Sequence, residues 1–208
     1  MTGTDTAELA PFALHVDSWN SLLDGSVTTG DSFTYDEATD SILPGGDSID
    51  ELNLYPGAGA TQLPPGNFGT VDIGPPSNST ADLSRQIRYG VNAADLAYFG
   101  GEFKLGADGT IDVQGDTGLS AGIKDDLIAI IGEPRAIPLF STVSGPGNNS
   151  TFTIVGFAGL RVLDVVLTGP MGLKQVIVQP AFVVSDAVIT EAGSGTSSFV
   201  YEPPRLTR

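Results

Sequence analysis

The chain has 208 residues, a length that suits one medium-sized domain or a main domain with a small appendage. It contains no cysteine, which excludes disulfide bonds, thiol nucleophiles and thiolate metal sites. Its 25 acidic residues outnumber its 9 lysines and arginines, and the formal net charge of −16 argues against binding to nucleic acid or to anionic lipid.

Glycine and proline are frequent, with 27 and 14 residues. This usage favours a turn-rich, strand-dominated fold. No apolar run approaches the ~18 residues that a membrane-spanning helix needs, and no basic and then apolar signal opens the chain. Residues Met1–Asp5 resemble a cut made inside a longer protein, so we expect any membrane anchor to lie outside this chain.

Residues 5–25 are predicted to form a leading segment and one short helix. Asp17 is placed to cap this helix, and Gly25 is placed to end it. Trp19, Leu22 and Leu23 give the helix an apolar side.

Strands and a break follow the first helix. Ser32–Tyr35 and Ser41–Leu43 flank a five-residue loop and predict a hairpin. Further strands are expected at Ile49–Tyr55 and Phe68–Ile73. Between them, residues 56–66 are rich in proline and glycine and give the best candidate for a domain boundary.

Two capped helices are predicted next. Ser79, with Asp82 three residues later, resembles a capping box, and Gly90 is placed at the C-terminal end of the same helix. Asn92 is placed to cap a second short helix that carries Leu96.

A second hairpin and a further helix are expected after these helices. Glu102–Leu105 and Thr110–Val113 flank a Gly-Ala-Asp-Gly turn. In Leu119–Ile131 the apolar residues recur on one face and charged residues lie on the opposite one, which predicts an amphipathic helix. Gly132 and Pro134 are placed to end it.

Three apolar strands are predicted in the last third of the chain, at Arg135–Val143, Thr151–Thr168 and Leu173–Val188. The middle strand is long and carries Gly156 and Gly159, so we expect a bulge or a bend there.

The predicted fold class is α+β, with a mostly antiparallel β-sheet or a partly open barrel and two or three short helices. Residues 1–60 are expected to form an N-terminal helix and hairpin segment packed on a main α+β domain at residues 61–190. Residues 191–208 are predicted to form a mobile tail, in which Phe199, Val200 and Tyr201 are able to dock.

Asp116-Thr117-Gly118 is the most conspicuous short motif, because aspartic proteases carry their catalytic carboxylate in this tripeptide. That chemistry needs two such aspartates that share a proton. Only one copy occurs here, so a homodimer would have to supply the other. The alternative is a helix start, in which Asp116 or Thr117 lies near the N-terminal amides, and we favour this alternative.

His15 is the only histidine, and no Gly-x-Ser-x-Gly motif accompanies it. A surface or half-buried position beside the first helix is therefore predicted. Acidic side chains recur near two turns and suggest calcium ligands, but no calcium-loop pattern is present. These acids are Asp108, Asp112 and Asp116, and then Asp36, Glu37 and Asp40. We interpret them as solvated. No catalytic, cofactor-binding or metal-binding residue is predicted, and no pair of acids is singled out for glycoside hydrolysis.

Six sequence blocks stand out by their order along the chain. They are LAPFAL at 9–14, PGNFGTVDIG at 65–74, NSTADLSRQI at 78–87, GDTGLSAGIKDDL at 115–127, PRAIPLF at 134–140 and IVGFAGLRV at 154–162. In this order they resemble the extracytoplasmic region of TadE/TadG-like Flp pilus-assembly proteins, in particular their planctomycete-type members. The resemblance runs from about residue 9 to residue 184.

The resemblance implies a non-catalytic, extracytoplasmic domain that helps to assemble a Tad/Flp-type pilus or an allied surface structure. It implies other pilus or cell-envelope proteins as partners, anchoring through a membrane helix missing from this chain, and no cofactor. From loop composition, Asn67–Thr70 and Gly145–Asn149 are expected to contact partners. Two alternatives stay open: a secreted hydrolase with an aspartic-type site at Asp116 in a dimer, and a calcium- or glycan-binding adhesin module.

Overall fold

The structure is a computed structural model. It describes residues 8–27, 30–55, 66–75, 79–184, 188–189 and 197–201. The predicted domain boundary at 56–66 falls almost entirely outside these residues. None of the helices in the described ranges is both long and apolar enough to cross a membrane.

Five strands close into a barrel. Around the barrel they are β1 (Phe12–His15), β5 (Phe68–Val71), β7 (Ile111–Asp116), β9 (Ser150–Val166) and β8 (Pro134–Ser144). Four of the neighbouring pairs are antiparallel, and β8 returns to β1 as a parallel neighbour. An odd number of strands cannot alternate direction all the way round a closed sheet, so one parallel pair is unavoidable, and here it joins β1 to β8.

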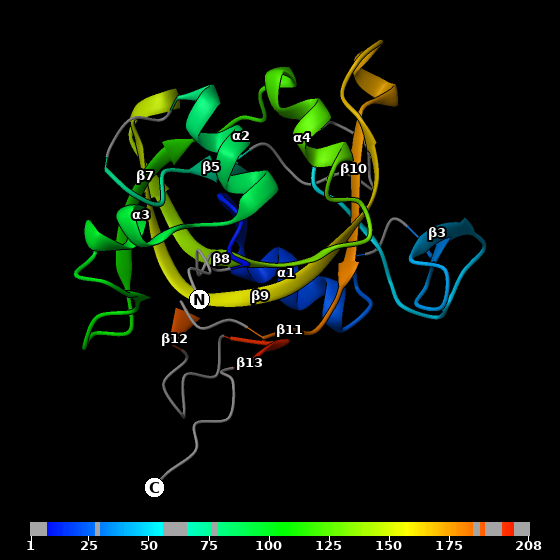
Figure 1. The fold of residues 1–208 in the computed structure, drawn as a ribbon, viewed down its shortest axis with the longest axis horizontal. Helices are drawn as coiled ribbons and strands as arrows, with labels where there is room; N and C mark the ends of the chain where they lie inside the picture. The colour runs from blue at the N-terminus through cyan, green and yellow to red at the C-terminus, as the bar shows by residue number, and fades with distance from the viewer. Residues whose placement is uncertain are drawn as a thin grey trace, which may run out of the picture.

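The longest strand, β9, organises the sheet. It pairs with β7 near its start, with β8 along most of its length, and with β10 (Gln175–Pro180) near its end, where β4 (Leu52–Asn53) extends the sheet. Figure 1 shows β9 as the long yellow strand that curves across the molecule. Leu139 pairs with Gly156 and Phe140 pairs with Ile154, so the register shifts beside Gly156 as the sequence predicts.

Four α-helices pack around the barrel in the part of the chain that the structure describes, where two or three were expected. They are α1 (Val16–Leu23), α2 (Thr80–Tyr89), α3 (Ala93–Ala97) and α4 (Lys124–Ile128). Helices α2 and α4 lie together on one side of the barrel (Figure 1). Three short 3₁₀ turns are formed by Ala121–Ile123, Gly147–Asn149 and Met171–Leu173.

The remaining strands are two or four residues long, and they pair with one another outside the barrel. The predicted first hairpin is confirmed by β2 (Phe33–Asp36) and β3 (Ser41–Pro44), which project from the barrel at the right of Figure 1. Strand β6 (Phe103–Lys104) pairs with β12 (Val188–Ile189). Strand β11 (Val183–Val184) pairs with β13 (Val200–Tyr201).

The barrel and its helices enclose two clusters of buried apolar side chains. One cluster contains Trp19 and Leu22 of α1 together with Leu83 and Ile87 of α2. The other is rich in aromatic rings, with Phe103, Phe140, Phe152 and Phe157 all fully buried. The predicted α+β class with a mostly antiparallel sheet is therefore confirmed, and the barrel is closed.

The first helix begins differently from the prediction. Its N-cap is His15, whose Nδ1 accepts a hydrogen bond from the backbone N–H of Asp17 at 3.2 Å. Asp17 lies inside the first turn, where a negative charge favours the positive end of the helix dipole. Gly25 follows the last turn with a φ of 72°, which suits its predicted role as a terminator.

Two other predictions need correction. Gly106 and Gly109 form the predicted turn, but β6 and β7 on either side pair with other strands. The predicted helix at 119–131 is divided into a 3₁₀ turn and the five-residue α4. Gly122 explains the division, since glycine is a poor helix former and Ser120 caps the 3₁₀ turn before it. The predicted apolar stripe is nevertheless buried at Ile123, Leu127 and Ile130.

The N-terminal segment belongs to the same core as the rest of the chain. Residues 12–15 form a barrel strand, and Asn53 of β4 accepts a hydrogen bond from Val176 of β10. Phe199 packs edge-to-face on Trp19, and Val200 is buried, so the predicted docking of this part of the tail is confirmed.

Candidate functional site

An open groove with a volume of about 590 Å³ lies where α1, the loop before β4, and the end of β10 meet. We call it the Arg161 groove. Its lining residues are Leu22, Leu23, Glu37, Ser48, Ile49, Asp50, Arg161, Gln179, Pro180, Ala181, Phe182 and Phe199.

Two polar side chains lie side by side in the Arg161 groove. Arg161 of β9 and Gln179 of β10 are direct partners in the antiparallel ladder. Directly opposed residues place their side chains on the same face of the sheet, with Cβ atoms about 5 Å apart. The ladder therefore presents a cation and an amide together.

The guanidinium of Arg161 is held from two directions. Its Nε donates a hydrogen bond to the carbonyl oxygen of Gly132 at 2.7 Å, and its plane lies 3.6 Å from the ring centre of Tyr35. Burial lowers the pKa of Arg161, and the nearby Tyr35 and Glu37 act in the opposite direction. The group remains a cation, because an arginine in a protein does not lose its proton.

Arg161 keeps hydrogen-bonding capacity after these contacts. Among the described residues, no carboxylate lies within ion-pair distance of Arg161, and its terminal Nη groups have no hydrogen-bond partner. The groove therefore contains positioned donors for a carbonyl or carboxylate oxygen.

Gln179 supplies the complementary acceptor. The residue is 1% exposed, and its Oε1 has no hydrogen-bond partner in the described structure. A buried amide oxygen without a donor costs about 1–3 kcal/mol, so a donor that reaches it from the groove gains free energy.

Apolar side chains and acids surround this polar pair. Phe182 is 67% exposed, Leu23 is 44% exposed and Ile49 is 38% exposed, although all three are apolar. Glu37 and Asp50 also line the groove. Exposed apolar groups that surround positioned hydrogen-bonding groups are typical of a surface that binds another molecule.

The structure places Asp116 at the end of β7, away from this groove. Its backbone pairs with Thr70 of β5, and its Oδ1 accepts a hydrogen bond from the N–H of Gly118 at 3.1 Å. The carboxylate thus closes a local turn and does not cap a helix, since the cap of the following 3₁₀ turn is Ser120. The favoured helix-start interpretation of Asp116 is wrong in this detail.

His15 is half-buried beside the first helix, as predicted. Because its Nδ1 accepts from Asp17, the ring proton lies on Nε2, which donates to the carbonyl oxygen of Ser141 at 3.1 Å. Its ring also packs edge-to-face on Phe140. The imidazole has a capping and packing role.

The acids of the two turns serve local contacts. Asp108 accepts from the N–H of Thr110, Asp36 accepts from the N–H of Ala38, and Asp40 accepts from the hydroxyl of Tyr35. Across the described ranges, no group of three or more acidic or histidine side chains is arranged to hold a metal ion.

A second, smaller pocket of about 260 Å³ brings two carboxylates together. Asp72 and Asp112 line it with Tyr98 and Gln114. Asp112 accepts a hydrogen bond from the hydroxyl of Thr153 at 2.8 Å. The sequence does not single out this pair, because Asp72 follows β5 and Asp112 lies in β7, and these two strands meet only in the barrel.

Two loops were expected to contact partners, and the prediction for Asn67–Thr70 is wrong. Phe68 and Thr70 are 1% and 3% exposed, because residues 68–71 form barrel strand β5. Gly145 and Gly147 are exposed in the turn between β8 and β9, so that loop stays a prediction.

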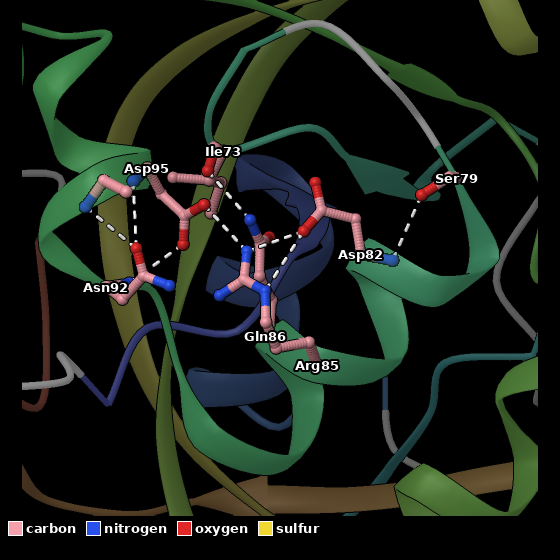
Figure 2. Close-up of polar contacts among 8 residues, drawn as sticks. Ile73, Ser79, Asp82, Arg85, Gln86, Asn92 and Asp95 are labelled. Atoms are coloured by element: carbon pink, nitrogen blue, oxygen red, sulfur yellow. Dashed lines mark hydrogen bonds and ion pairs between the residues drawn. The ribbon is translucent and has the colours of Figure 1, made fainter.

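A network of ion pairs joins helices α2 and α3 (Figure 2). Arg85 of α2 contacts Asp82 at 2.6 Å and Asp95 of α3 at 2.7 Å. Asn92 and Asp95 form the capping box of α3, while Gln86 donates from Nε2 to the carbonyl oxygen of Ile73. Figure 2 shows the guanidinium between the two carboxylates, which indicates a structural role.

Sequence reasoning missed the Arg161 groove. Arg161 and Gln179 are 18 positions apart and each looks like an ordinary strand residue. The signal that existed was a long polar side chain, Arg161 in one strand and Gln179 in the next, that interrupts an apolar run.

Comparison of this chain with family models, with curated proteins and with solved structures found no match.

Proposed function

We propose that this chain is a non-catalytic, extracytoplasmic domain of a TadE/TadG-like protein. In this proposal it takes part in assembling a Tad/Flp-type pilus or surface structure by binding other pilus or cell-envelope proteins. The resemblance of the sequence blocks is the basis for the family, for the extracytoplasmic location and for a membrane anchor outside this chain.

The Arg161 groove is the single observation that carries the binding role. It presents the terminal donors of Arg161 beside Gln179 of the neighbouring strand, among exposed apolar side chains. A carbonyl oxygen of an extended peptide would accept a hydrogen bond from those donors.

The occupant that fits this groove is an extended segment of a partner protein that carries an apolar side chain and a basic residue. The apolar side chain would cover Phe182, Leu23 and Ile49, which are exposed in this structure. The basic residue would approach Glu37 and Asp50 at the groove. The net charge of −16 adds a long-range attraction toward a basic partner surface.

The local roles of the two most reactive-looking side chains support a non-catalytic reading. Asp116 closes a turn, and His15 caps a helix. An Asp116→Asn variant is expected to leave the behaviour of the protein in a proteolysis screen unchanged.

Binding to purified pilin and to the purified sister components tests the proposal. We expect Phe182→Ser to weaken the association by about tenfold or more, since burying a large exposed apolar anchor contributes over 1 kcal/mol. Leu173→Ser is the matched control, because Leu173 is 65% exposed and lies outside the groove. Its affinity should stay within about twofold of the native protein.

Titration calorimetry gives the affinities, and loss of piliation on gene deletion gives the role in the cell. The proposal is wrong if none of the pilus components binds the purified domain and deletion leaves piliation intact. Equal weakening by Phe182→Ser and Leu173→Ser would show that binding uses another surface.

A further inference from the structure

The strongest additional feature is the C-terminal segment of residues 197–201, which adds to the sheet as a separate strand. Between its pairings with β7 and β10, the middle of β9 lacks a long neighbour on one side. The segment fills this position and also pairs in parallel with β11 (Figure 1).

Backbone hydrogen bonds hold the segment on both sides. The N–H of Ser198 donates to the carbonyl of Phe157, and the N–H of Gly159 donates to the carbonyl of Ser198. On the other side, the N–H of Val183 donates to the carbonyl of Phe199 at 2.8 Å. The contacts are those of a strand that adds to an open edge.

Side chains make the site specific for this segment. Trp19 donates from Nε1 to the hydroxyl oxygen of Ser198 at 2.7 Å. The ring of Phe199 packs against Trp19 and Phe182, and Val200 is buried against the aromatic core cluster. The site therefore selects a strand with a small hydroxyl residue, an aromatic ring and a β-branched residue in succession.

The stretch of chain before this strand permits its exchange between molecules. Residues 190–196 connect β12 to the segment, and seven residues reach about 24 Å when extended. That reach allows the segment to enter the same site of a neighbouring molecule. The segment keeps its conformation there, including the φ of 62° at Phe199.

We propose that residues 197–201 form an exchangeable strand, and that the site between β9 and β11 binds the same segment of a second copy of this chain. Exchange replaces each contact within the molecule by an identical one between molecules. The equilibrium between unexchanged and exchanged molecules therefore depends on the protein concentration. A tether of this kind gives a millimolar effective concentration, so copies crowded in a surface structure can compete with it. This inference goes beyond the proposed function, because it concerns contacts between copies of this chain.

Disulfide trapping tests the exchange without interference from native thiols, because the chain has no cysteine. Val183 and Val200 are register partners in neighbouring strands, about 4.8 Å apart in a sheet, a spacing that a disulfide bridges. The single variants Val183→Cys and Val200→Cys are purified separately, mixed at about 1 mM, a concentration comparable with the tether's, and oxidised gently. We expect a disulfide-linked heterodimer on a non-reducing gel.

A mixture of Leu173→Cys and Val200→Cys is the control for random collision, and it should give at least tenfold less dimer. Excess synthetic peptide of residues 197–201 should suppress the specific dimer at least fivefold. Circular dichroism checks that Val183→Cys is folded. If it is not, a mixture of Ala158→Cys and Ser198→Cys gives the same measurement, because Ala158 and Ser198 are also paired between neighbouring strands.

The proposal is overturned if the mixture gives no more dimer than the collision control while the double variant Val183→Cys/Val200→Cys closes its disulfide only within one chain. This readout needs no pilus component, so it fails or succeeds independently of the proposed function.

Discussion

At the scale of single residues, Gly159 shows how closely three backbone segments approach. A Cβ atom at this position would lie 2.2 Å from the carbonyl oxygen of Ala181 and 2.5 Å from that of Phe199. Both neighbours are backbone atoms, which cannot rotate away as a flexible side chain can. The position therefore requires glycine for space.

We predict that Gly159→Ala lowers the free energy of unfolding by about 3 kcal/mol, because the added methyl group forces the strands apart. Gly172→Ala is the control, since nothing lies within 4 Å of a Cβ there, and its effect should stay within about 0.5 kcal/mol. Urea denaturation measures both. Equal midpoints for the two variants would contradict the packing described at Gly159.

Glu51 is a buried carboxylate whose environment disfavours its charge. Its Oε1 accepts hydrogen bonds from the N–H groups of Ser32 and Phe33, at 2.8 and 2.7 Å. Burial raises the pKa of Glu51 despite these bonds, and the nearby Asp31 and Asp47 raise it further. The native state therefore binds this proton more tightly than the unfolded state does.

The raised pKa of Glu51 determines how the stability of the protein changes with pH. The contribution of Glu51 to stability is greatest below its unfolded pKa of about 4.3 and decreases as pH rises through the raised folded value. We predict that Glu51→Gln gains stability relative to the native protein as pH rises from about 4 to 7. Urea midpoints across that range measure it, and an equal change of midpoint with pH in the two proteins would contradict it.

At the scale of the elements, the caps of α2 and α3 were predictable because they depend on neighbours in the sequence. Ser79 accepts from the N–H of Asp82, Gly90 follows α2, and Asn92 caps α3, as the sequence indicated. Asp95 completes a capping box with Asn92. Pairings between distant strands were not predictable in this way. The turn at 106–109 looked like a hairpin, yet its two flanking strands find better neighbours elsewhere.

Arg85 joins α2 to α3 through two carboxylates, and Asp95 is almost fully buried. We predict that Arg85→Ala lowers the free energy of unfolding by about 2 kcal/mol, because Asp95 loses a charged partner away from water. Lys104→Ala removes an ion pair with Glu102 in which both side chains are exposed, and should cost under about 0.5 kcal/mol.

Thermal and urea unfolding of the Arg85→Ala and Lys104→Ala variants distinguish these cases. Arg85→Lys is a useful third variant, because a single ammonium group cannot contact two carboxylates with the fork of a guanidinium. Its stability should lie between those of the native protein and Arg85→Ala. A loss for Lys104→Ala as large as that for Arg85→Ala would contradict a buried network.

At the scale of the whole molecule, composition and local patterns predicted the α+β class, the dominance of strands and most of the individual strands. They did not predict the order of strands in the barrel or the Arg161 groove. Both depend on register between strands far apart in the chain, as in the pairing of Arg161 with Gln179. A hydrophobic pattern fixes which face of a strand is buried but not which strand lies beside it.

The parallel contact between β1 and β8 also constrains how the protein is made. Leu14 of β1 lies beside Leu139 of β8, so β1 is synthesised more than a hundred residues before this neighbour exists. Such high contact order slows folding and leaves the apolar β1 strand without its β8 neighbour during that time. A chaperone that shields β1 until β8 has been synthesised would therefore raise the yield of native protein more than one that acts on the completed chain.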